Sequence, residues 1–275
     1  MLVAEVMLQQ TQASRVEPAW RSFMARFPTV GDLAAASPAE VIRSWAGLGY
    51  NQRAVRLQAA ARVVVERHGG RIPRDPAPLA SLPGVGPYTA RAVAATAFDR
   101  PVAAVDTNVR RVVGRVFGLE RLAGRAGGGW AVRQVQGLAD AWISRRRTAA
   151  WTHALMDVGA TLCRPRDPLC FECPLQRLCL HAAPAAAAGI AGEAPPRGAH
   201  RPERPAVPFP ATRRWLRGRL VARLREQADG RWVELSGPFG GHSAEAVGDA
   251  LGRLVRDGLV ERDDRGRVRL PVGPT

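Results

Sequence analysis

The stretch LASLPGVGPYTARAVAATAFDRPVAAVDTN, residues 79–108, decides the fold. It predicts a helix that ends before Pro83, a tight turn through Gly84 and Gly86, and a second helix from Tyr88 to Phe98. We expect both glycines to adopt backbone angles that other residues avoid. A glycine turn leading into a helix start presents backbone N–H groups and the positive end of the helix dipole. Gly84 and Gly86 are therefore candidate phosphate contacts, although a simple chain reversal would use the same residues.

The composition indicates a polyanionic partner. The chain has 275 residues and a formal net charge of +16, and all 40 of its basic residues are arginine. Such a charge favours nucleic acid as the partner. No apolar run reaches the roughly 18 residues of a membrane span, and the start MLVAEVMLQQTQ lacks the features of a secretion signal. We expect an intracellular protein without a membrane partner, with room for a main domain and a small second one.

Glu5 is a candidate general acid. Residues 2–27 carry apolar side chains at helical spacing, and Pro18 is expected to divide them into two helices. The neighbours of Glu5 offer almost no polar face. A carboxyl group in apolar surroundings has a raised pKa and stays protonated near neutrality. The alternative is a solvated glutamate on a helix surface.

Asp106 is the second acidic candidate. It precedes a helix predicted from Val109 to Phe117, where an aspartate serves as N-cap and accepts hydrogen bonds from free backbone N–H groups. A carboxylate capped in this way stays ionised, which suits it to stabilise positive charge. Asn108 is expected within one turn of it. Capping and chemistry are compatible roles.

The turn GLGY, residues 47–50, presents Leu48 and Tyr50 between two predicted helices, 38–46 and 54–68. As functional groups, the two side chains would act as a wedge and a stacking surface for a base opened out of a duplex. The alternative is that both cover the core.

The C-terminal part predicts a separate small unit. Residues 183–210 are rich in alanine and proline and predict a linker. Residues 211–275 contain two helical patterns, 213–225 and 244–259, followed by an alternating hairpin that turns at residues 264–266. This order resembles a winged helix, and an accessory cap on the preceding domain is the alternative.

All four cysteines lie in CRPRDPLCFECPLQRLC, which follows a helix predicted from Ala149 to Leu162. Four thiolates this close together can surround one metal centre, either zinc or an iron–sulfur cluster. Zinc sites more often use two close pairs separated by a longer loop, so the uneven spacing favours a [4Fe–4S] cluster. Arg164 and Arg166 are expected to face outward as phosphate contacts. The predicted ligands are Cys163, Cys170, Cys173 and Cys179.

Together these motifs resemble the helix–hairpin–helix DNA glycosylases of the endonuclease III superfamily, and among them the MutY-type adenine glycosylases. The resemblance covers about residues 2–180. It rests on EVMLQQTQ (5–12), GLGY (47–50), LPGVGPYTA (82–90), VDTNVRRV (105–112), MDVGATLC (156–163) and the cysteine spacing. It implies a mainly α fold with an iron–sulfur cluster loop, followed by the small α/β winged-helix-like unit. The glycosylase core would span residues 1–182, with a six-helix part at about 18–117 and a cluster part from 1–17 and 118–182.

The resemblance also implies roles. Family members excise adenine mispaired with 8-oxoguanine or guanine, so Glu5 would protonate adenine N7 and Asp106 would face the sugar, with Tyr88 and Asn108 beside Asp106. Breaking the N-glycosidic bond between adenine and the sugar needs one protonated and one ionised carboxyl group. Glycoside hydrolysis divides its two carboxyl groups in the same way. Further residues are expected at the DNA: Gln10, Thr11, Leu48 and Tyr50 at the opened duplex, and Arg110 and Arg111 at phosphates.

Lysine-dependent chemistry is not expected. Bifunctional relatives attack the sugar with a lysine amine, whereas Tyr88 stands in that position here and the sequence contains no lysine. We therefore expect a monofunctional, monomeric enzyme that acts on mismatched or damaged double-stranded DNA in the cytoplasm, at the nucleoid. Two alternatives stay open: a thymine or uracil mismatch glycosylase of the same fold, and a non-catalytic iron–sulfur DNA-binding regulator.

Overall fold

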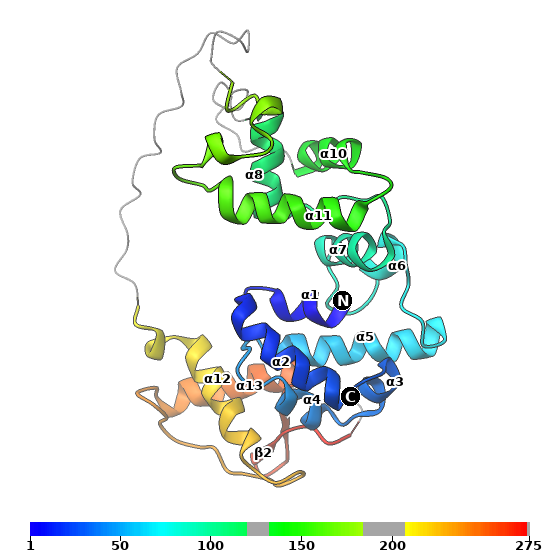
Figure 1. Cartoon of the computed structure of the whole chain (residues 1–275). Helices are drawn as coiled ribbons and strands as arrows, with labels where there is room; N and C mark the ends of the chain where they lie inside the picture. Colours follow the sequence, from blue (N-terminus) through cyan, green and yellow to red (C-terminus); the bar gives the residue numbers. More distant parts are fainter. Residues whose placement is uncertain (120–131, 184–206, 274–275) are drawn as a thin grey trace. The chain divides into compact units, whose positions relative to one another are not determined.

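The computed structural model describes residues 1–119, 132–183 and 207–273 (Figure 1). They form two compact units. Apart from Met1, the cysteine unit consists of residues 74–80 together with the described residues from Gly86 to 183. The terminal unit joins residues 2–73 and 81–85 with 207–273. Most of the predicted linker, residues 184–206, lies outside the described residues.

The cysteine unit is helical. Its helices are α6 (Pro76–Ala80), α7 (Pro87–Phe98), α8 (Thr107–Val116), α10 (Val132–Trp142) and α11 (Thr148–Asp157). A π-helical turn, η1 (Val158–Leu162), continues α11, and two 3₁₀ turns follow, η2 (Cys170–Glu172) and η3 (Gln176–Leu178). The strongly amphipathic α8 buries Val109, Val112 and Val116 against Val135 of α10 and Leu155 of α11. This core fixes α8, which carries Asp106 at its start, against the segment that leads into the cysteines.

The terminal unit begins with five helices: α1 (Leu2–Leu8), α2 (Ala13–Arg26), α3 (Val30–Ala35), α4 (Pro38–Ser44) and α5 (Gln52–His68). Capping boxes define two helix starts, Thr29 with Asp32 for α3 and Ser37 with Glu40 for α4. After the undescribed residues come the 3₁₀ turn η4 (Phe209–Ala211), α12 (Arg213–Arg225), α13 (Ala244–Arg256), β1 (Glu261–Arg262) and β2 (Val268–Arg269). The two strands are antiparallel, with Glu261 opposite Arg269.

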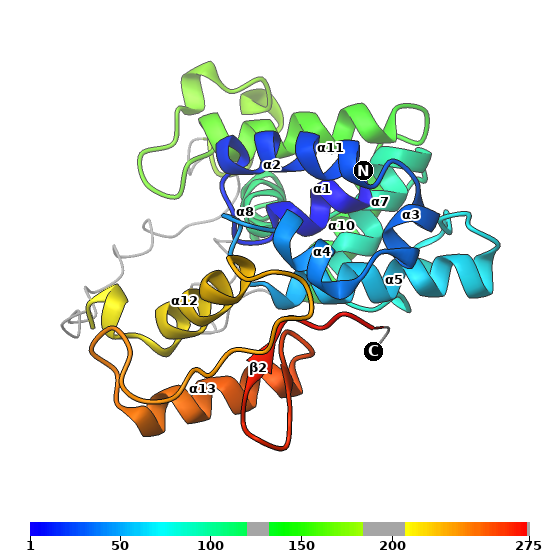
Figure 2. The same ribbon diagram turned by 90° about the horizontal axis from the view of Figure 1, so that it is seen from below.

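The C-terminal helices share a core with the N-terminal ones. Leu216 and Leu220 of α12 and Leu251 of α13 are buried in one cluster with Ile42 of α4. The backbone N–H of Ala39 donates a hydrogen bond of 2.9 Å to the carbonyl of Pro271. Figure 2 shows α12, α13 and the strand β2 beside α4 and α5. Residues 207–273 are therefore built onto the N-terminal helices.

The mainly α fold class is confirmed, since β1 and β2 are the only strands in the described ranges. The helix at 213–225 and the hairpin turn at 264–266 are also confirmed. Two helices followed by a hairpin are the order expected of a winged helix, which stays a prediction. No helix in the described part of the chain is long and apolar enough to span a bilayer.

Two local predictions were wrong. Pro18 does not divide two helices but lies inside α2, and the break falls at residues 9–12, where Gln10 has a φ of +55°. A proline there removes only the bond to the carbonyl of Ser14, and Ser14 is exposed, so water can satisfy that group. Gly84 has the expected positive φ of +76°, but Gly86 has a φ of −82° and caps α7 in ordinary extended conformation.

Candidate functional site

Asp106 is the N-cap of α8, as predicted. Its Oδ1 accepts a hydrogen bond of 2.6 Å from the backbone N–H of Val109. Its Oδ2 accepts one of 3.2 Å from Nδ2 of Asn108. Both side chains are half-buried. Since each carboxylate oxygen has a donor, the orientation of the group is fixed by α8 itself.

Arg111 connects this capped carboxylate to the cysteine segment. Its Nη2 donates to Oδ1 of Asn108 at 2.9 Å and to the carbonyl of Gly159 at 2.6 Å. Its Nε donates to the carbonyl of Cys163 at 2.6 Å. The sequence suggested a phosphate contact for Arg111, and the structure gives it an internal role as well. Gly159 permits the close approach, because a methyl group there would lie 2.7 Å from Cβ of Asn108.

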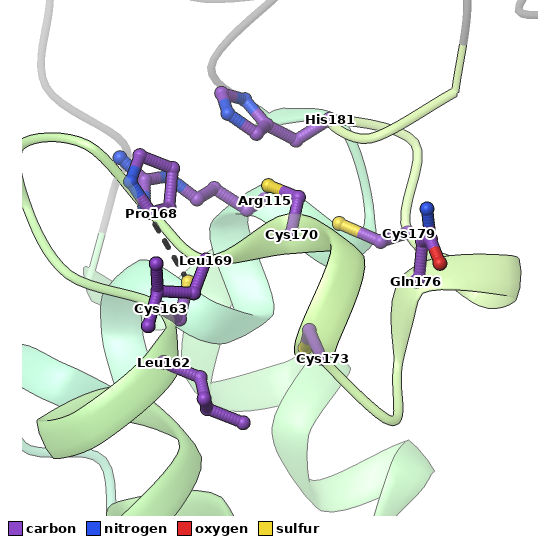
Figure 3. Close-up of a pocket in the computed structure, with 10 residues that line it drawn as sticks. All are labelled: Arg115, Leu162, Cys163, Pro168, Leu169, Cys170, Cys173, Gln176, Cys179 and His181. Atoms are coloured by element: carbon purple, nitrogen blue, oxygen red, sulfur yellow. Dashed lines mark hydrogen bonds between the residues drawn. The ribbon is translucent and has the colours of Figure 1, made fainter.

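The four cysteines line one pocket (Figure 3). None of them forms a disulfide. Arg115 of α8, only 7 % exposed, donates from Nη1 to Sγ of Cys163 at 3.4 Å and to the carbonyl of Arg164 at 2.7 Å. Because Arg111 and Arg115 are four residues apart, they share one face of α8. Together they hold the start of residues 163–179, the cysteine loop, against this helix. Sequence analysis missed Arg115, and its helical spacing from Arg111 was the available signal.

The arrangement of the thiols bears on which metal centre they could hold. No group of three or more His, Cys, Asp or Glu side chains within the described ranges lies close enough to hold a single ion. A zinc ion needs all four sulfurs about 2.3 Å from one point, whereas a [4Fe–4S] cluster spreads its thiolates over several iron atoms. Burial raises the pKa of the Cys170 and Cys179 thiols. Four free thiols around one pocket provide the donor set of a cysteine-bound metal centre.

In the terminal unit, Arg53 of α5 organises the segments that carry EVMLQQTQ and GLGY. Its Nη1 donates to the carbonyls of Val6, Met7 and Gln9 at 2.7–2.8 Å. Its Nη2 donates to Oγ1 of Thr11 at 3.0 Å and to the carbonyls of Leu48 and Gly49 at 3.1 and 3.2 Å. Burial lowers the pKa of Arg53. Sequence analysis missed this residue, because its role lies in contacts with segments distant in sequence.

The predicted duplex-opening residues lie around this arginine. Thr11 Oγ1 approaches the carbonyl of Leu48 at 3.4 Å. The Leu48 side chain is 4 % exposed and part of the core, whereas Tyr50 is 39 % exposed. Gln10 and Tyr50 both have positive φ, at +55° and +44°. Strained non-glycine residues of this kind concentrate at functional sites.

The remaining predicted residues are placed individually. Glu5 lies half-buried in the middle of α1, and Tyr88 lies half-buried in the first turn of α7. A methyl group at Gly84 would lie 2.8 Å from Cβ of Arg56, so this turn needs glycine for space as well as for φ. The other predicted phosphate contacts are half-buried Arg110 and exposed Gly86, Arg164 and Arg166.

Comparisons with known proteins identify the family. Residues 3–125 match the family described as HhH-GPD superfamily base excision DNA repair protein. The adenine DNA glycosylase of Mycolicibacterium smegmatis is 39 % identical over 278 residues, covering 98 % of this chain and 86 % of that protein. This chain belongs to the adenine DNA glycosylase family. As a member of that family it is a DNA N-glycosylase of base excision repair.

A second adenine DNA glycosylase and a solved structure also match this chain. The human adenine DNA glycosylase is 46 % identical over 179 residues, covering 64 % of this chain and 32 % of that protein. The structure of a thermostable thymine-DNA glycosylase matches with a TM-score of 0.59 and 32 % identity, over 66 % of this chain and 82 % of that one. The likeness to a thymine enzyme shows that the fold alone does not decide which base is removed.

Proposed function

We propose that this DNA N-glycosylase hydrolyses the N-glycosidic bond of adenine mispaired with 8-oxoguanine or guanine in double-stranded DNA. The observation that carries the proposal is the 39 % identity with an adenine DNA glycosylase over 98 % of the chain. The target base is extruded from the duplex before the reaction, as in other enzymes that act on a base. We infer that the enzyme acts on this DNA in the cytoplasm, at the nucleoid, and as a monomer.

The proposed chemistry divides two tasks between two carboxyl groups. Glu5 donates a proton to N7 of adenine, which turns a poor leaving group into a better one, and such acid catalysis contributes about 10²- to 10⁴-fold. Asp106 keeps its negative charge and stabilises the positive charge that develops on the sugar. The two hydrogen bonds that fix the Asp106 carboxylate support this role. Asn108 and Tyr88 are assigned beside it on the basis of the family resemblance.

As the bond between the sugar C1′ and adenine N9 breaks, adenine leaves with the bonding electrons and water adds to C1′. The proton that this water loses passes to the Glu5 carboxylate, so the reaction ends at an abasic site with Glu5 protonated again. A lyase step needs an amine that attacks the sugar and forms a Schiff base, and the chain contains no lysine. Borohydride, which reduces such an adduct to a stable one, is expected to trap no covalent protein–DNA complex efficiently. Efficient trapping would contradict the monofunctional assignment.

Cys163, Cys170, Cys173 and Cys179 are the proposed ligands of a [4Fe–4S] cluster. The four free thiols around one pocket support this assignment. The cluster would tie the loop between its ligands into one shape. Arg115, which bonds Cys163 and the carbonyl of Arg164, would hold that loop against α8, and exposed Arg164 and Arg166 would face DNA phosphates.

The test is base release by the purified protein from three duplexes that contain A:8-oxoguanine, T:G or U:G. We expect release of adenine alone, and we expect Glu5→Gln to abolish it while DNA binding persists. The likeness to a thymine-DNA glycosylase favours a thymine or uracil enzyme as the second candidate. Release from T:G or U:G that withstands Glu5→Gln would establish that candidate. A protein that binds DNA and releases no base would be a regulator.

A further inference from the structure

We propose that helix α12 supports the turn GLGY, residues 47–50, which we call the duplex-opening turn. In this proposal Arg214 of α12 is a positioning residue that holds the ring of Tyr50. The proposal rests on the proposed function in one respect, namely that Tyr50 stacks in opened DNA. It assigns to residues 207–273 a role at the turn itself.

The contact between the two side chains carries the proposal. Cζ of Arg214 lies 4.1 Å from the centroid of the Tyr50 ring, and Cζ of Arg53 lies 5.7 Å from it. The two arginines come from opposite ends of the sequence, Arg53 from α5 and Arg214 from the first turn of α12. A guanidinium group attracts the negative face of an aromatic ring and stacks on it. Tyr50, although 39 % exposed, is therefore restrained by charged groups from two segments.

A second arginine anchors α12 to the same turn. Arg225 lies eleven residues after Arg214, which is about three helical turns, so both occupy one face of α12. Its Nη2 donates to Oδ1 of Asn51 at 2.8 Å and its Nε donates to the carbonyl of Ile42 at 3.0 Å. Arg225 is half-buried, and burial lowers the pKa of its guanidinium to about 10. The residue next to Tyr50 is thus bonded to the far end of α12.

Further bonds lock the position of α12 beside the turn. Arg43 of α4 donates to the carbonyl of Gln227 at 2.8 Å and to that of Arg225 at 3.3 Å. Asp257 accepts a hydrogen bond of 3.1 Å from Nε2 of Gln52 and also pairs with Arg217 of α12. Helix α12, from which Arg214 projects, is therefore held in place by bonds that involve residues before and after the turn, Arg43 and Gln52.

This support matters because the turn is strained. Tyr50 has a φ of +44°, which a residue with a side chain rarely adopts, and it follows Gly49 at +68°. A ring on such a turn loses rotational freedom when it inserts between bases. Restraining it beforehand lowers that entropic cost, as in other preorganised interfaces. A contact of this type at an exposed site corresponds to about a two- to fivefold effect on binding.

The experiment compares Arg214→Ala with Arg213→Ala, a neighbouring exposed arginine whose loss changes the net charge equally. The probe is a duplex with a tetrahydrofuran abasic-site analogue and an adjacent 2-aminopurine, whose fluorescence rises when the base unstacks. We expect Arg214→Ala to weaken binding and opening about two- to fivefold, and Arg214→Lys to restore part of the loss. Arg213→Ala is expected to have the smaller effect. Thermal unfolding of each variant verifies that it folds.

The variant Tyr50→Leu separates positioning from simple charge. If Arg214 acts through the ring, Arg214→Ala causes no additional loss in a Tyr50→Leu protein. Equal losses from Arg214→Ala and Arg213→Ala would overturn the proposal, and so would a loss that persists without the tyrosine. The probe carries no adenine to release. A wild-type protein that opens it but releases no adenine elsewhere refutes the proposed function alone, whereas one that fails to bind it refutes both.

Discussion

Nε of Arg111 donates a hydrogen bond of 2.6 Å to the backbone carbonyl of Cys163, while Nη2 of the same guanidinium donates to Oδ1 of Asn108 at 2.9 Å. The Arg111 side chain thus connects Asn108, which donates a hydrogen bond to Asp106, with Cys163, the first of the four cysteines. Because the guanidinium is planar, its bonds fix the two groups in one mutual orientation. The structure of the cysteine loop and the orientation of Asn108 are therefore coupled.

Arg111→Ala is expected to impair both ends of this connection. It leaves the carbonyls of Gly159 and Cys163 without a donor, which costs about 1–3 kcal/mol of the free energy of unfolding. We expect lower iron content, measured by visible absorbance, together with slower adenine release. The control Arg133→Ala removes an exposed arginine of α10 and is expected to change unfolding by no more than about 0.5 kcal/mol. Full iron content in Arg111→Ala would contradict the coupling.

The packing of Gly159 against α8 gives a second prediction. Gly159→Ala places a methyl group 2.7 Å from Cβ of Asn108, so α8 or the π-helical turn has to shift. We expect a loss of about 1–3 kcal/mol in unfolding free energy and a lower rate of base release. The matched control is Gly137→Ala in α10, where a methyl group meets no atom within 4 Å. There the same substitution is expected to stabilise the protein by up to about 1 kcal/mol.

The role of Asp106 in base release can be separated from its role as the N-cap of α8. Asparagine caps a helix as well as aspartate does, so Asp106→Asn keeps the bond to Val109 and is expected to change unfolding very little. Without the negative charge, base release in single-turnover experiments is expected to fall by at least about 100-fold. Asp106→Ala is expected to cost about 1 kcal/mol of stability in addition. Base release by Asp106→Asn at the wild-type rate would remove Asp106 from the reaction.

Sequence patterns predicted the local features, because those depend on neighbouring residues. The helix at 213–225, the N-cap at Asp106 and the positive φ of Gly84 follow from periodicity, capping preference and glycine chemistry. The errors arose where context overrides a local rule. Pro18 lies within α2, where Ser14, the residue whose carbonyl it leaves unbonded, is exposed.

The sequence could not reveal side chains whose partners lie far along the chain. Arg225 bonds Asn51, which is 174 residues away, and Arg115 reaches Cys163 over 48 residues. In a chain with 40 arginines, composition suggests phosphate contacts for all of them. Only the structure separates half-buried arginines that join distant segments, such as Arg53 and Arg111, from exposed ones such as Arg166.

Arg53 tests whether a half-buried arginine stabilises the fold by bonding two segments at once. Its two terminal nitrogens donate to five backbone carbonyls and to Oγ1 of Thr11, which joins the end of α1 to the GLGY turn. Lysine keeps the charge but presents one compact ammonium group that cannot bond both segments at once. Arg53→Lys is therefore expected to lower the free energy of unfolding by about 2–4 kcal/mol, because several buried carbonyls lose their donor.

The control for Arg53→Lys is Arg67→Lys, the same substitution at an exposed position of α5. It is expected to leave unfolding unchanged within about 0.5 kcal/mol. Chemical denaturation measures both variants, and the abasic-site duplex with 2-aminopurine measures opening. Arg53 holds both Thr11 and the turn that carries Tyr50. We therefore expect Arg53→Lys to open the abasic-site duplex less than the wild type does, even at temperatures where the variant is fully folded. If the folded variant opens DNA like the wild type, the connection between α1 and the turn serves stability alone.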